Sequence, residues 1–117
     1  MVVDDSDEVR SVMAMQLRAS GYEVIEARDG REALELAREH RPSVIFMDIH
    51  MPGMDGLTAT RLLREVEGLS DTRIAAFSVF GDDNRQLALD AGCDAYFNKT
   101  ENINRLPGIA AQFLSPA

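Results

Sequence analysis

The chain has 117 residues, a formal net charge of -8 and 45% hydrophobic residues, enough for one folded domain and too few for two. Its single cysteine, Cys93, excludes an internal disulfide and is typical of a reducing cytoplasm. The 20 acidic against 12 basic residues argue against binding to nucleic acid, and no apolar run approaches the ~20 residues of a membrane span. We therefore expect a single cytoplasmic domain over residues 1–117 that binds neither nucleic acid nor membrane.

Short apolar runs alternate with segments of helical period in the first part of the chain. Ser6 and Asp29 each precede such a segment and are suited to be helix N-caps. The pattern predicts a strand, a helix, a strand and a helix over residues 1–3, 6–20, 22–27 and 29–40.

The apolar run at residues 44–47 ends at Asp48 and predicts a central strand that is covered on both faces. A helix follows Gly56, and another is expected to start at Asp82 or Asp83. The remaining elements are two strands and a last helix, over residues 74–78, 95–98 and 106–114.

Five strands that alternate with five helices predict an α/β fold with a doubly wound five-stranded parallel sheet. Ligands of such sheets bind at the carboxyl ends of the strands. The polar residues that follow the predicted strands are therefore expected to meet at one edge, and they are Asp4, Asp5, Asp48, Ser78 and Lys99.

Each of these residues alone is better explained as a helix cap, a turn former or a solvated charge. Together they indicate a site, because three carboxylates about 5 Å apart repel by roughly 3 kcal/mol per pair at an effective dielectric of 20. A divalent cation would offset this repulsion, and an all-oxygen site suits Mg2+.

The same pocket suits phosphoryl chemistry, because Lys99 can hold a second anion opposite a bound cation. The sequence has neither a GxxxxGK[ST] nor a GxGxxG loop, so the nucleophile is expected to come from the protein. Asp48 ends the most buried strand and can accept a phosphoryl group as an acyl phosphate.

Four motifs carry a resemblance to a known family. They are VVDDS at residues 2–6, FMDIHMPGMDG at 46–56, AFS at 76–78 and AGCDAYFNK at 91–99. In this order and spacing, over essentially the whole chain, they resemble the receiver domain of two-component response regulators. The resemblance implies the flavodoxin-like fold of receivers.

The resemblance also implies roles for the residues of the site. Asp48 corresponds to the phosphoacceptor, and Asp5, Asp48 and the backbone carbonyl of His50 correspond to the Mg2+ ligands, with Asp4 acting mainly through a bound water. Lys99 corresponds to the lysine that binds the phosphoryl group.

Two further positions correspond to switch residues. Ser78 resembles the hydroxyl that turns toward the acyl phosphate, and Tyr96 resembles the aromatic residue that rotates inward as Ser78 moves. Such a protein would take the phosphoryl group from a sensor histidine kinase or a histidine phosphotransfer protein and signal to a downstream target or output domain. It would catalyse its own phosphorylation and dephosphorylation without turnover of a separate substrate, and it could form a homodimer.

The sequence departs from the family pattern at several positions. Thr100 stands where the family usually has a proline in the cis form, and Val79 follows Ser78 where a small residue is common. Phe80 and His50 occupy positions that tune loss of the phosphoryl group, and we expect apolar Phe80 to hinder attack by water. A Phe80→Glu variant that dephosphorylates no faster would contradict this expectation.

Two alternative functions stay open at this point. The Thr100 and Val79 departures support a degenerate receiver that binds a partner regardless of phosphorylation, whereas the retention of the five polar residues of the site argues against it. A magnesium phosphatase with an aspartyl intermediate ranks lower, because such enzymes usually have a second aspartate two residues after the nucleophile, where this chain has His50.

Overall fold

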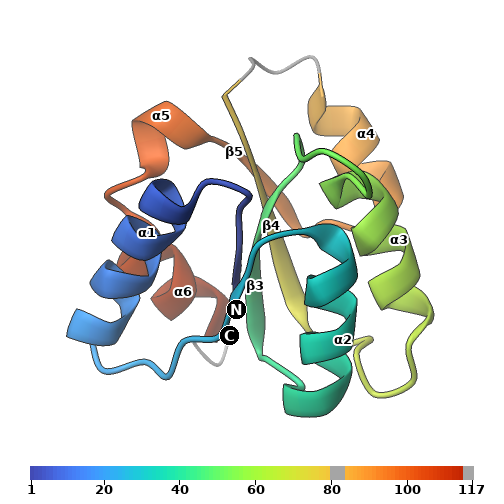
Figure 1. The fold of residues 1–117 in the computed structure, drawn as a ribbon, viewed down its shortest axis with the longest axis horizontal. Coiled ribbons are helices and arrows are strands. Elements are labelled where there is room, and N and C mark those ends of the chain that lie inside the picture. The colour runs from blue at the N-terminus through green and yellow to red at the C-terminus, as the bar shows by residue number, and fades with distance from the viewer. Residues whose placement is uncertain (80–83, 115–117) are drawn as a thin grey trace.

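Five parallel strands form the centre of the molecule, in the order β2-β1-β3-β4-β5 (Figure 1). The computed structural model describes residues 1–79 and 84–114. This strand order is that of flavodoxin-like sheets and confirms the predicted fold class. The strands are β1 (Val2–Val3), β2 (Glu26–Ala27), β3 (Val44–Asp48), β4 (Arg73–Ser78) and β5 (Ala95–Asn98).

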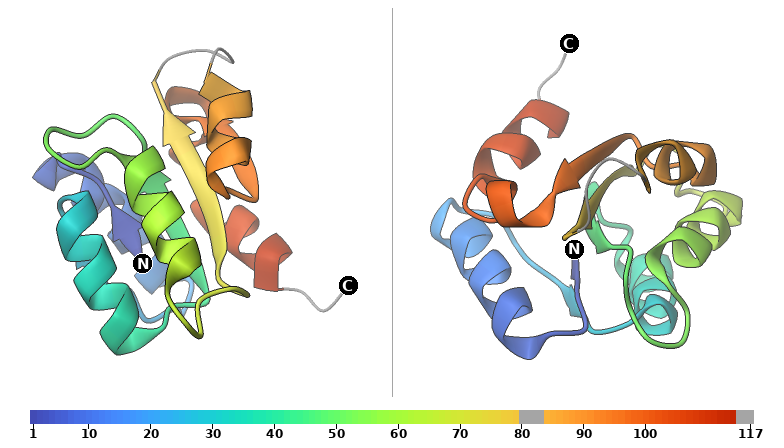
Figure 2. Two further views of the ribbon diagram at one scale, coloured as in Figure 1. Left: turned by 90° about the vertical axis from the view of Figure 1, so that its right-hand side faces the viewer. Right: turned by 90° about the horizontal axis from the view of Figure 1, so that it is seen from above.

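Helices cover both faces of the sheet (Figure 1, Figure 2). α1 and α6 pack together on one face, and α2, α3 and α4 cover the other. The helices are α1 (Asp7–Ala19), α2 (Gly30–His40), α3 (Gly56–Glu65), α4 (Arg85–Ala91), α5 (Lys99–Asn102) and α6 (Leu106–Leu114). No helix of the described segments is long and apolar enough to cross a lipid bilayer.

The predicted N-caps of the first two helices are confirmed. The side chain of Ser6 accepts a hydrogen bond from the backbone N–H of Val9 at 3.3 Å, and that of Asp29 accepts one from Glu32 at 2.8 Å. The expected helix start at Asp82 or Asp83 lies outside the described residues.

Two expectations about the elements are wrong. The described residues contain six helices rather than five, because Asn98 caps the single turn of α5 by accepting from the Glu101 N–H, and four residues are too few for a periodic pattern. The second strand covers only Glu26–Ala27 instead of residues 22–27, because it lies at the sheet edge and pairs only with the two residues of β1.

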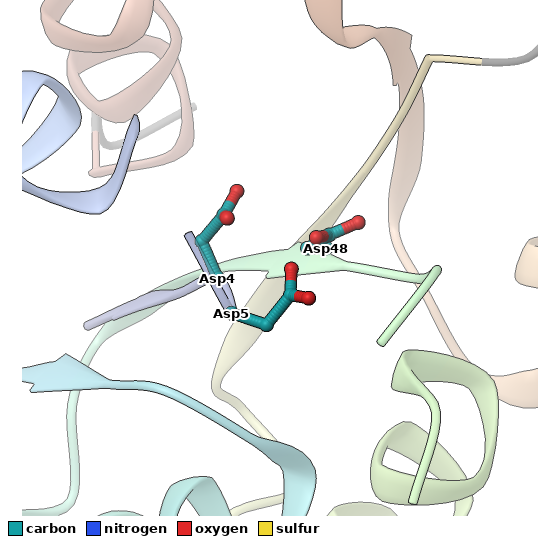
Figure 3. Close-up of side chains that lie close together, drawn as sticks. All are labelled: Asp4, Asp5 and Asp48. Carbon is teal, nitrogen blue, oxygen red and sulfur yellow. The ribbon is translucent and has the colours of Figure 1, made fainter. Parts of the chain in front are cut away.

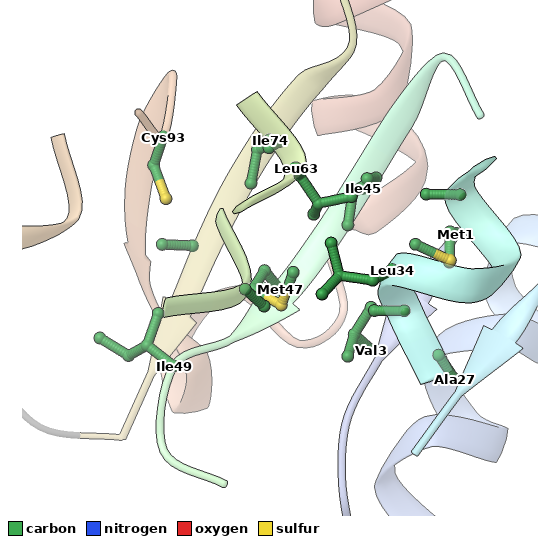
Figure 4. Close-up of a cluster of buried hydrophobic side chains, with 14 of the residues drawn as sticks. Met1, Val3, Ala27, Leu34, Ile45, Met47, Ile49, Leu63, Ile74 and Cys93 are labelled. Atoms are coloured by element: carbon green, nitrogen blue, oxygen red, sulfur yellow. The ribbon is translucent and has the colours of Figure 1, made fainter. Parts of the chain in front are cut away.

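Apolar side chains on β3 alternate between two buried clusters, one on each face of the sheet. Ile45 and Met47 point toward α2 and α3, where Leu34 and Leu63 pack against the sheet (Figure 4). Phe46 points to the opposite face and packs edge to face on Phe77 of β4, with ring centroids 5.8 Å apart. Burial on both faces explains the continuous apolar run of this strand.

Candidate functional site

Three carboxylates meet at the carboxyl ends of two neighbouring strands (Figure 3). Asp4 and Asp5 follow β1, and Asp48 is the last residue of β3. One oxygen from each lies within 4.8 Å of the others, as the sequence predicts. Asp4 and Asp48 are buried and Asp5 is exposed, so the cluster opens to solvent on one side.

Each buried carboxylate accepts a hydrogen bond from a nearby backbone N–H. Asp4 Oδ1 accepts from Ser6 at 2.9 Å, and Asp48 Oδ1 accepts from His50 at 3.1 Å. These bonds orient the two side chains and leave one oxygen of each, Asp4 Oδ2 and Asp48 Oδ2, directed to other partners.

Lys99 places a positive charge between the two buried aspartates. Its Nζ lies 2.5 Å from Asp4 Oδ2 and 3.5 Å from Asp48 Oδ2. Burial lowers the pKa of Lys99. The hydrogen bond with Asp4 and the charge of Asp48 raise it by more, so the net effect is a raised pKa. The ammonium is therefore charged at neutral pH and faces both buried aspartates.

Burial raises the pKa of Asp48 to about 6. The backbone N–H of His50 and the charge of Lys99 lower it, whereas the charges of Asp4 and Asp5 raise it. One lysine thus does not neutralise three carboxylates, and the site retains an excess of negative charge that a cation can bind.

Gly56 shapes the backbone behind Asp48, a role that the sequence patterns did not reveal. A Cβ at Gly56 would lie 2.3 Å from the Asp48 carbonyl oxygen and 2.7 Å from Ile49 Cα. Only a glycine lets the first turn of α3 approach β3 so closely. This approach fixes the loop that carries His50.

Ser78 is the buried last residue of β4. Its Oγ lies 3.0 Å from Nε2 of His50, which follows Asp48 by two residues. The same ring nitrogen lies 3.3 Å from Nδ2 of Asn84, just before α4. From the sequence, His50 is expected only to supply a backbone carbonyl and to tune loss of the phosphoryl group, so these side-chain contacts are an addition.

Tyr96 is 3% exposed, and its side chain packs in the apolar cluster under α3 and α4. The guanidinium carbon of Arg85 lies 5.2 Å from the ring centroid, and Arg85 Nη1 donates to the Tyr96 carbonyl at 3.4 Å. The ring is thus already inside in this structure, whereas the inward rotation expected from the sequence requires an outward starting position.

The described residues contain no cis peptide bond, so Lys99–Thr100 is trans and Lys99 reaches the aspartates without a cis bond. Val79 is 56% exposed. Phe80, for which we expect an effect on dephosphorylation, lies outside the described residues.

A family model described as the response regulator receiver domain matches residues 1–111. The chain belongs to this family. It is thus a receiver domain of two-component signalling, a class of domain that interacts with kinases or phosphotransfer proteins and with downstream targets.

Individual relatives agree with this assignment. The receiver is 37% identical over 120 residues to the polar-differentiation response regulator DivK of Brucella anthropi, with 100% of this chain and 96% of the relative covered. Its structure is similar to that of the chemotaxis protein CheY4 of Vibrio cholerae, with a TM-score of 0.89, 31% identity and coverage of 97% and 95%. A solved structure from Chloroflexus aurantiacus gives a TM-score of 0.89 at 28% identity, with coverage of 98% and 95%.

Proposed function

We propose that Asp48 is the phosphoacceptor of this receiver and that its phosphorylation switches the protein between two conformations. The observation that supports this assignment is the meeting of Asp4, Asp5 and Asp48 within 4.8 Å, with Lys99 beside the two buried aspartates. A carboxylate next to a cation site and an ammonium suits phosphoryl transfer, which depends on position and on neutralisation of charge.

In the proposed reaction a carboxylate oxygen of Asp48 attacks the phosphorus of a phosphohistidine on the donor protein. A P–O bond forms, the P–N bond breaks, and the leaving imidazole nitrogen keeps the electron pair and takes up a proton. Lys99 then neutralises charge on the phosphoryl oxygens. Ionised Asp48 is the nucleophile, so a cation that favours its ionised form raises the fraction of the protein that can react.

The acidic cluster fits Mg2+, which prefers carboxylate, carbonyl and water oxygens. We propose Asp5, Asp48 and the backbone carbonyl of His50 as its ligands. Asp4 is assigned contact through a water, because its Oδ2 is held close to Lys99 Nζ, at 2.5 Å, whereas Asp48 Oδ2 lies 3.5 Å from the same nitrogen. Bound Mg2+ would supply neutralisation of the negative charge on the transferring group.

The switch is assigned to Ser78 and Tyr96. A phosphoryl oxygen that accepts a hydrogen bond from Ser78 in only one conformation stabilises that conformation. The register of β4 and β5 supports a connection between the two residues, because Ser78 pairs with Asn98, two residues after Tyr96.

We also propose binding partners and a cellular location for this receiver. The phosphoryl donor is a sensor histidine kinase or a histidine phosphotransfer protein, and the receiver of the signal is a downstream protein or an output domain. We further propose that residues 1–117 form a single receiver domain that acts in the cytoplasm and can form a homodimer.

Intact mass spectrometry tests the proposal. The protein is incubated with acetyl phosphate and Mg2+, and one added phosphoryl group is expected. Asp48→Asn should abolish the adduct, whereas Asp71→Asn, a change at an exposed aspartate, should retain it. If the parent protein forms no adduct and also fails to bind beryllofluoride with Mg2+, the degenerate receiver becomes the better description.

Turnover of a small phosphoester by the isolated protein would instead support the phosphatase alternative. The second aspartate usual in such enzymes is absent here, because His50 stands two residues after Asp48.

A further inference from the structure

His50 contacts both the switch serine and the start of α4. Its Nε2 lies 3.0 Å from Ser78 Oγ and 3.3 Å from Asn84 Nδ2. Its backbone N–H donates to Asp48 Oδ1 at 3.1 Å. One residue therefore contacts the proposed phosphoacceptor through its backbone and the proposed switch hydroxyl through its ring.

We propose that His50 is a positioning residue that accepts the hydroxyl proton of Ser78 in a hydrogen bond and thereby competes with the phosphoryl group on Asp48 for this hydroxyl. The proposal rests on the proposed function of Asp48. It goes beyond that function, because it names a side chain that opposes the switch.

The competition follows from the hydrogen-bonding capacity of the groups. A serine hydroxyl carries one proton and donates one hydrogen bond at a time. Phosphoryl oxygens only accept, so Ser78 must donate to bind them. A hydroxyl that donates to His50 Nε2 must break this hydrogen bond before it can bind the phosphoryl group. Breaking the bond makes the phosphorylated conformation less favourable.

Burial makes the competition consequential. Ser78 is 0% exposed, so its hydroxyl depends on protein or phosphoryl partners rather than on water. His50 itself is exposed, so its ring can move away without opening the core. The ring is therefore a removable partner for a buried hydroxyl.

Asn84 extends the effect to α4. It is the N-cap residue of this helix, yet its side chain makes no capping hydrogen bond and instead reaches His50. The next residue, Arg85, covers the ring of Tyr96. Movement of His50 would thus change the contacts of the first turn of α4 and, through Arg85, those of Tyr96.

The test measures the equilibrium binding of beryllofluoride in the presence of Mg2+, which mimics the phosphoryl group and is unaffected by the rate of dephosphorylation. The full chain is compared with His50→Ala, Ser78→Ala and the double variant by calorimetric titration. His40→Ala, a change of the other histidine at the end of α2, is the matched control.

His50→Ala is expected to bind beryllofluoride about 3- to 10-fold more tightly, the change that corresponds to loss of one neutral hydrogen bond. In the Ser78→Ala background the same substitution should change affinity less than 2-fold. His50→Gln retains a hydrogen-bond acceptor, so its affinity for beryllofluoride should stay near that of the parent. His40→Ala should have the same affinity as the parent.

Imidazole 15N chemical shifts add a spectroscopic readout. In the unliganded protein Nε2 of His50 should have the shift of a nitrogen that accepts a hydrogen bond, and Ser78→Ala or beryllofluoride should change it while His40 stays constant. The proposal would be overturned if His50→Ala left the affinity for beryllofluoride unchanged or lowered it. It would also be overturned if His50→Ala raised this affinity equally in the Ser78→Ala background. A parent protein that binds no beryllofluoride would instead refute the proposed function, and this inference with it.

Discussion

Lys99 Nζ lies 2.5 Å from Asp4 Oδ2, and this ion pair joins the start of α5 to the loop that follows β1. Both side chains are largely buried, with 12% and 1% of their surface exposed. The pair therefore places a cation at the back of the acidic cluster, where it also contacts Asp48 at 3.5 Å. Stability and cation binding should be linked at this site.

Lys99→Met is expected to destabilise the protein in EDTA by about 1 to 3 kcal/mol, because it leaves the buried carboxylate of Asp4 without its counter-charge. Millimolar Mg2+ should recover most of this loss, so the thermal midpoint of the variant should rise more with Mg2+ than that of the parent. Arg31→Met, a change at an exposed arginine of α2, is the control. Equal Mg2+ responses of variant and parent would contradict the prediction.

Asp48→Asn is expected to stabilise the metal-free protein at neutral pH. The folded pKa of Asp48 is raised from 3.8 to about 6, so the folded state binds the proton more tightly than the unfolded state. Stability contributed by this group is therefore lost as the pH rises from about 4 to about 6. After a discount for solvent screening, the variant should gain about 1 to 2 kcal/mol at pH 7.5.

Urea unfolding in EDTA at several pH values measures this effect. The stability difference between Asp48→Asn and the parent should shrink as the pH falls toward 5. A stability difference that grows toward acid pH would have the opposite sign and would refute the raised pKa.

Gly56→Ala is expected to cost at least about 2 kcal/mol and to weaken beryllofluoride binding, because its Cβ would overlap the Asp48 carbonyl oxygen and displace the loop that follows it. Gly108→Ala in α6 is the matched control, since nothing lies within 4 Å of its Cβ position. That variant should gain up to about 1 kcal/mol from helix propensity. Chemical denaturation measures the change in stability, and a titration measures the change in beryllofluoride affinity. Similar changes for Gly56→Ala and Gly108→Ala would disprove the close approach of Gly56 to Asp48.

Arg64→Met is expected to cost about 2 kcal/mol, because Arg64 links α3 to the turn before β5. Its guanidinium donates to the carbonyl of Thr72 at 2.6 Å, to that of Gly92 at 2.9 Å and to Asp94 Oδ2 at 2.9 Å. Asp94 in turn accepts from the Ile74 N–H at 2.8 Å.

The exposed Arg61 of the same helix provides the comparison, and Arg61→Met should change stability by less than about 0.5 kcal/mol. Urea unfolding separates the two variants. Beryllofluoride affinity should be unchanged in both, because Arg64 contacts the end of the sheet opposite to Asp48. An affinity loss in Arg64→Met would show that this network also supports the site.

Local patterns in the sequence determined the elements of the fold. Ser6 and Asp29 cap their helices as predicted, because N-cap hydrogen bonds form within three residues along the chain. The apolar run that ends at Asp48 indicated a strand buried on both faces, and the aspartates after β1 and β3 predicted the acidic cluster. Parallel strands place their carboxyl ends together whatever the details of packing.

Only the tertiary structure decided what these residues contact. The sequence did not reveal that Lys99 pairs with Asp4, that His50 binds Ser78, that Gly56 lies against Asp48, or that β2 shortens to match β1. These features depend on atoms that are distant in sequence and on tenths of an ångström in packing. Residue type and spacing specify which side chains reach the edge of the sheet, whereas strand order, helix docking and rotamers decide which of them touch.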